Sequence, residues 1–72
     1  MKYILILWVC SFINGPNCSP PMVSEKIYDS WYECSQAAYV KSRQVVTKLG
    51  YAYVNEHEVA TKFTCKPVSP AI

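Results

Sequence analysis

The most apolar segment of the chain is a run near its start. Residues 3–13 carry isoleucine, leucine, valine or an aromatic residue at nearly every position, and none of them is charged. Such a run is typical of a strand that is buried on both faces, and it is equally typical of a short targeting segment.

A turn and a second strand follow this run. The segment NGPNCSPP is dense in turn-forming residues, and Asn14 with Gly15 favours the positive φ values of a tight hairpin turn. Residues 22–28 then alternate weakly between apolar and polar side chains. The prolines at their start and the charges within them predict an edge strand.

The next element has clear helical signals. Apolar positions recur with helical spacing from residue 31 onward, while polar side chains occupy the other side. Ser30 and Glu33 have the spacing of a capping box, in which the two side chains satisfy free backbone N–H groups at a helix start. Gly50 suits the left-handed conformation that ends many helices. The pattern predicts one helix over residues 31–49.

The last part of the chain alternates again. We expect a loop at residues 51–57 and then a half-buried strand over residues 59–66, because the sequence EVATKFTCK has a period of two. In a rival interpretation, YAYV forms a strand that pairs with EVATKF. Pro67 and Pro70 are expected to end regular structure.

In chain order the predicted elements are strand, strand, helix and strand. If the first two strands form a hairpin, a right-handed crossover through the helix places the last strand against the first. The sheet order is then 2-1-3, with the most apolar strand in the centre. We therefore predict a small α+β domain over residues 1–67, a two-layer split β-α-β sandwich, with a short tail over residues 68–72.

Four cysteines are many for a reduced protein of 72 residues. Cys10 and Cys18 are symmetric about the predicted turn, and the topology brings Cys34 and Cys65 to one end of the molecule. Of the three possible connectivities, this geometry favours Cys10–Cys18 with Cys34–Cys65. Loop-closure entropy gives the longer bridge about 3.7 kcal/mol and the shorter about 2.6 kcal/mol. A core of this size contributes roughly 3–5 kcal/mol, so the bridges would decide whether the domain folds.

The cysteines also define a pattern over most of the chain. An aliphatic strand ends in Cys10, Cys18 follows a turn, SWYEC places Cys34 at a helix start, and FTC places Cys65 in the last strand. In this pattern the chain resembles short four-cysteine proteins of bacteria and phages. The resemblance implies no function, so no functional residue is carried over.

Other candidate chemistry is sparse. Zinc binding and free buried thiols are alternatives to disulfides, but no two cysteines have the close spacing typical of zinc fingers and ribbons. His57, the single histidine, lies between Glu56 and Glu58, and a solvated loop residue is a better interpretation than a general base. The sequence contains no catalytic or ligand-binding signature. It predicts no enzyme, no cofactor and no metal.

Charge and tyrosine content bear on partners. The net charge is only +2, and the basic residues of the second half are dispersed, so a solvated surface is favoured over a nucleic-acid-binding face. Those basic residues are Lys41, Arg43, Lys48, Lys62 and Lys66. Several tyrosines, an open strand edge and an apolar sheet face opposite the helix point instead to self-association or an unknown protein partner. The tyrosines are Tyr28, Tyr32, Tyr39, Tyr51 and Tyr53.

The first apolar run has two interpretations, a retained strand or a signal segment. It has a signal peptide's single positive charge and hydrophobic stretch, but no small-x-small site precedes a good cleavage point. Cleavage after Gly15 would also leave three cysteines. We favour a retained strand in a non-catalytic, disulfide-stabilised interaction protein with no stable membrane span. The alternatives are a secreted or membrane-tethered peptide with a signal segment at residues 1–15, and a weak nucleic-acid-binding module. The compartment stays open, secreted or periplasmic if the run is a signal.

Overall fold

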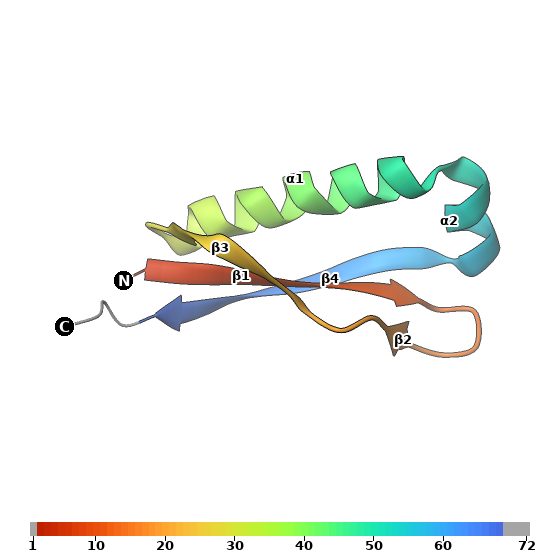
Figure 1. Ribbon diagram of the computed structural model, residues 1–72, viewed down its shortest axis with the longest axis horizontal. Coiled ribbons are helices and arrows are strands. Elements are labelled where there is room, and N and C mark those ends of the chain that lie inside the picture. Colours follow the sequence, from red (N-terminus) through yellow and green to blue (C-terminus); the bar gives the residue numbers. More distant parts are fainter. Residues whose placement is uncertain (1, 69–72) are drawn as a thin grey trace.

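A computed structural model describes residues 2–68 of the chain. In it one long helix lies over one face of a sheet, which gives the molecule two layers (Figure 1). The elements are β1 (Lys2–Ser11), β2 (Asn17–Cys18), β3 (Met22–Tyr28), α1 (Trp31–Leu49), α2 (Tyr51–His57) and β4 (Val59–Val68). The predicted α+β class and its two-layer arrangement are confirmed.

Strand β1 is the centre of an antiparallel sheet. Strand β4 pairs with its whole length, from Lys2 opposite Val68 to Ser11 opposite Val59. Strands β3 and β2 pair with different parts of its other side. The sheet therefore has the predicted order, with the charged strand β3 at one edge. The most apolar strand lies in the middle, with strands on both sides of it.

The predicted hairpin joins β1 to the short strand β2. Cys10 lies opposite Cys18 and Ser11 opposite Asn17, so the register is symmetric about the turn. Gly15 has a φ of 91°, a value that side chains disfavour and glycine adopts readily. Two prolines then separate β2 from β3. This edge of the sheet is therefore interrupted. Strand β3 pairs with the first part of β1, and β2 pairs with its last two residues.

Helix α1 begins and ends where its local signals predict. The Ser30 hydroxyl accepts a hydrogen bond from the Glu33 backbone N–H at 3.2 Å, and it lies 3.1 Å from the Glu33 carboxylate. Gly50, with a φ of 91°, ends the helix and donates its N–H to the Val46 carbonyl. The predicted range of residues 31–49 is confirmed.

The loop predicted at residues 51–57 is wrong, because these residues form the helix α2. Gly50 turns the chain, and its carbonyl accepts the first α2 hydrogen bond from the Val54 N–H at 3.0 Å. The helix then stops at Glu58, which has a left-handed φ of 48°. The rival strand at YAYV is therefore wrong as well. A single glycine, Gly50, both ends α1 and starts α2. In the sequence it indicated only the end of a helix, so the second helix was missed.

Strand β4 is longer than predicted. Pro67 does not end regular structure, since it lies inside β4 opposite Tyr3. An edge strand tolerates proline, because the N–H groups that point away from its only neighbour make no ladder hydrogen bond. Pro70 and the rest of the predicted tail beyond Val68 lie outside the described residues.

The core lies between α1 and one face of the sheet. Its buried side chains are Leu5, Tyr28, Cys34, Ala38 and Cys65. A disulfide joins Cys34 of the first turn of α1 to Cys65 of β4, with Cα atoms 6.2 Å apart. A second disulfide joins Cys10 to Cys18 across the hairpin. Both disulfides that the fold prediction expected are present.

Candidate interaction surface

Alternate residues of β1 point to opposite faces of the sheet. Leu5 contacts the core under α1 and is only 1% exposed. Because successive side chains of a strand alternate, Ile4, Ile6 and Trp8 lie on the face that α1 does not cover. These three large side chains are half-buried. A strand that is apolar on both faces thus supplies the core on one side and a surface on the other.

Neighbouring strands extend this surface on both sides of β1. On β3, Ile27 lies opposite Ile4 and Val23 lies opposite Ile6, and these two side chains are 52% and 57% exposed. On β4, three polar residues face the same β1 positions. We call the whole surface the open face; it consists of Ile4, Ile6, Trp8, Val23, Ile27, Lys62, Thr64 and Lys66.

The open face has a basic margin. Lys62 lies opposite Trp8, and its Nζ atom is 4.9 Å from the centre of the indole ring, a cation–π distance. Lys66 lies opposite Ile4. Within residues 2–68 neither lysine forms an ion pair. The β4 side of the apolar strip therefore carries positive charge, while on β3 the exposed Glu25 lies between Val23 and Ile27.

The ion pair that the described residues do form lies beside the start of β1. Lys2 donates a hydrogen bond to the Asp29 carboxylate, just after β3. This hydrogen bond and the attraction between the charges raise the pKa of Lys2 and lower the pKa of Asp29. Both side chains are exposed, so the pair ties the end of β3 to β1 without removing charge from water.

The sequence-predicted site residues do not come together. All four cysteines are in disulfides, so the protein has no free thiol. The His57 ring packs at 4.3 Å between centroids against Tyr53, and the His57 carbonyl accepts a hydrogen bond from the Ser11 hydroxyl at 2.6 Å. In the part of the chain that the structure describes, no three His, Cys, Asp or Glu residues lie where they could hold a metal ion.

The basic residues are divided between the two layers. Lys62 and Lys66 belong to the open face, while Lys41 and Lys48 lie on α1 and line a cavity beside β3. Arg43 is exposed elsewhere on the helix. The layout separates these charges into two groups rather than one continuous patch.

The tyrosines are distributed unevenly. Tyr28 is buried in the core, whereas the tyrosines of the helices are exposed. The exposed ones are Tyr32, Tyr39, Tyr51 and Tyr53. Tyr39 also packs edge-on against Phe63 at 5.4 Å between ring centroids, so part of its ring covers the core. These rings lie on the helical layer, and none of them belongs to the open face.

Comparison of the chain with protein-family models, curated proteins and solved structures found no match. Neither helix among residues 2–68 is long and apolar enough to cross a membrane. The alternation of residues 59–66 was the signal that placed Lys62 and Lys66 on one face of the last strand. This alternation could not show that Val23 and Ile27 lie on the same face as Lys62 and Lys66. The pairing of β3 with β1 is irregular between Ile4 and Ile6, so the face of β3 residues does not follow from spacing alone.

Proposed function

We propose that this protein is a non-catalytic, disulfide-stabilised interaction module that binds a protein partner through the open face. The observation that carries the proposal is the exposure of an aliphatic strip on a sheet whose other face already forms the core. Exposed apolar patches on small soluble domains commonly mark interaction sites, because covering them removes apolar area from water.

The composition of the open face favours a partner of particular chemistry. Trp8 lies at the end of the open face nearest the hairpin, beside Lys62, and tryptophan is among the residues that dominate binding energy at interfaces. The isoleucines next to Trp8 would pack against an apolar patch. Lys62 and Lys66, which form no ion pair among residues 2–68, would meet carboxylates at its rim. A second copy of this chain would bring the same two lysines, Lys62 and Lys66, to the interface. A different, acidic partner is therefore the better complement.

The two disulfides support this role by fixing the surface. Cys10–Cys18 closes the hairpin at one end of β1, and Cys34–Cys65 ties β4 to the helix behind it. A surface that is already rigid loses less conformational entropy when it binds. This argument explains why so small a domain would contain two bridges beside an apolar strip.

Capture from an extract of the native host tests the proposal with matched variants. Ile27→Glu places a charge on the open face at an exposed position, and Val40→Glu makes the same change on α1, where Val40 is 55% exposed. We expect the wild type and Val40→Glu to retain the same protein, and Ile27→Glu to lose it. A photo-reactive residue at Ile6 should crosslink to that protein.

Two results would contradict the proposal. Retention of the partner by Ile27→Glu as strongly as by Val40→Glu would place the binding surface elsewhere. Capture of no protein by any of the three, with circular dichroism showing each one folded, would argue against an interaction module.

A further inference from the structure

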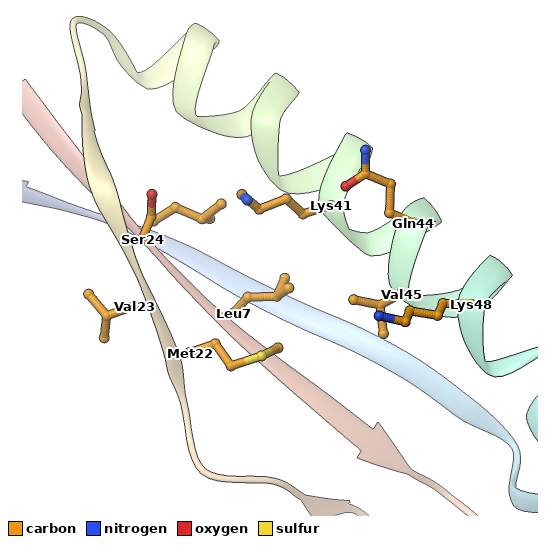
Figure 2. A pocket seen from close by; sticks show the side chains of 9 residues that line it. Leu7, Met22, Val23, Ser24, Lys41, Gln44, Val45 and Lys48 are labelled. Atoms are coloured by element: carbon orange, nitrogen blue, oxygen red, sulfur yellow. The ribbon is translucent and has the colours of Figure 1, made fainter.

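A cavity of about 310 Å³ lies on the covered side of the sheet, between the second half of α1 and the strands β1 and β3. Figure 2 shows its residues converging from the helix and from both strands. We call it the α1–β3 groove; it is lined by Leu5, Leu7, Met22, Val23, Ser24, Lys41, Gln44, Val45 and Lys48. Val23 lies at its edge, since its side chain projects away from α1 in Figure 2.

The groove forms because β3 does not pair evenly with β1. Between Ile4 and Ile6 the register with β3 shifts, and the Ser24 hydroxyl there accepts a hydrogen bond from the Lys26 N–H at 3.1 Å. The bulged segment leaves Leu5 without a partner residue on β3, whereas Leu7 pairs with Met22. Leu5 and Leu7 are 1% and 3% exposed, so water has little access to them in the groove.

The floor of the groove is wholly aliphatic. Leu5 and Leu7 of β1, Met22 of β3 and Val45 of α1 provide it, and no aromatic ring takes part. Unbranched, flexible Met22 adapts to the shape of a guest. No polar side chain is buried among residues 2–68, so the floor offers a ligand no hydrogen bond from a buried side chain.

The rim of the groove is cationic. Lys41 and Lys48 are seven residues apart, about two helical turns, and therefore project from the same side of α1. Figure 2 shows both ammonium groups reaching from the helix toward the strands, with Gln44 between them along α1. No acidic residue lines the groove, and neither lysine forms an ion pair within the described range. Two free positive charges thus stand over an apolar floor.

We propose that the α1–β3 groove binds a single-chain anionic amphiphile, a fatty-acid carboxylate. The alkyl chain would lie on Leu5, Leu7 and Val45, and the carboxylate would bind between Lys41 and Lys48. Charge-assisted hydrogen bonds to the two ammonium groups hold the head, and burial of the chain provides the remaining affinity.

The lining distinguishes a fatty acid from a peptide. A peptide backbone placed on this floor would give up hydrogen bonds to water and find no buried side-chain partner, at a cost for each group. An alkyl chain has no such bonds to lose. The volume lies at the small end of the range for ligand sites, which suits one chain rather than the two of a bilayer phospholipid.

Titration calorimetry with octanoate, decanoate and dodecanoate, each below its micelle concentration, tests the proposal. We expect saturable binding of one molecule per chain. Affinity should rise about fourfold with each added methylene, the factor that corresponds to burial of one such group. Decanol, with the same chain as decanoate and no charge, should bind roughly tenfold more weakly or worse.

Two paired variants assign the site. Lys41→Gln with Lys48→Gln should weaken decanoate roughly tenfold and leave decanol unchanged. Lys62→Gln with Lys66→Gln removes the same charge from the open face and should leave decanoate binding unchanged. All four lysines are exposed, so both variants are expected to fold.

Three outcomes would overturn this assignment. The first is equal weakening by the two paired variants, which would show unspecific attraction to a basic protein. The second is binding that does not saturate or does not depend on chain length. The third is no fatty-acid binding together with tight binding of an acidic peptide that Lys41→Gln with Lys48→Gln abolishes. None of these results bears on the partner captured by the open face, so the two proposals fail independently.

Discussion

The two faces of the sheet are made from one strand and differ in what covers them. On one face, Leu5 packs against Cys34 and Ala38 of α1 and is closed off from water. On the other, Ile4 and Ile6 have only strand neighbours, and Ile27 beside them is half exposed. The domain has a single long helix and covers a single face with it. The second set of apolar side chains exceeds what the core requires, which is why we assign it to binding.

The largest effect is expected from removing β1, the strand that both faces share. A chain lacking residues 1–15 loses β1, and β4 and β3 then have no common neighbour. We expect that chain to show no cooperative thermal unfolding, because the remaining strands and helix have no continuous core. Circular dichroism during heating measures this. A cooperative transition in the shortened chain would mean that β1 is not the centre of the fold.

The next test compares the two disulfides, since only one of them links the layers. Replacing Cys34 and Cys65 with alanine opens a loop spanning 31 positions and should cost about 3.7 kcal/mol of unfolding free energy. Replacing Cys10 and Cys18 opens a loop spanning 8 positions and should cost about 2.6 kcal/mol.

Urea unfolding of the oxidised proteins gives both values. Non-reducing peptide mapping of the wild type should first recover Cys10 joined to Cys18 and Cys34 joined to Cys65. Recovery of Cys10 joined to Cys65 would contradict the topology. A larger loss from the hairpin bridge than from the bridge between the layers would reverse the comparison.

Two neighbouring residues of β1, one on each face, allow the stability contributions of the two faces to be compared directly. Leu5→Ala leaves a cavity under α1 and should cost about 3 kcal/mol. Ile6→Ala removes a half-buried side chain from the open face, where water fills the space, and should cost about 1 kcal/mol. Chemical denaturation with equal m-values measures the difference. Equal losses at the two positions would mean that both faces are packed alike.

The smallest expected effect concerns the Lys2–Asp29 pair at the end of β1. Because the folded protein lowers the pKa of Asp29, the stabilisation is present above the unfolded value of about 4 and is lost as the pH falls through the folded value. Because the pKa of Lys2 is raised, the stabilisation is also lost as the pH rises above about 10.

Asp29→Asn should therefore lower the melting temperature slightly near pH 7 and match the wild type at pH 2. Added salt should reduce the difference, since both side chains are exposed. A difference that persists unchanged at pH 2 would show that the carboxylate charge is not its source.

Local signals predicted much of this fold. Ser30, Glu33 and Gly50 fix the ends of α1 by hydrogen bonds within a few residues, so they can be recognised without tertiary information. The symmetry of Cys10 and Cys18 about the turn likewise follows from spacing alone. The apolar run required one further argument, because its composition suits a strand and a targeting segment equally. Its central place in the predicted sheet order favoured the strand, and Lys2–Ser11 form β1 in the structure.

The features that were missed depend on neighbours distant in sequence. Pro67 is tolerated because β4 has one partner strand, which the residues around it do not reveal. Helix α2 is the exception, because it begins directly after Gly50, whose turn was interpreted only as the end of α1. The α1–β3 groove depends on the register shift opposite Ile4 and Ile6 and on where Lys41 and Lys48 then lie over it. Periodicity assigns residues to faces, but it does not say which faces remain uncovered.

Methyl NMR with a soluble paramagnetic agent tests the central claim, that β1 has one covered and one open face, most directly. We predict cross-peaks between the Leu5 methyls and the Ala38 methyl, and none between the Ile6 methyls and α1. The agent should broaden the Ile27 and Ile6 methyls and spare those of Leu5, which is 1% exposed. Cross-peaks from Ile6 to α1, or equal broadening of Leu5 and Ile6, would contradict the account.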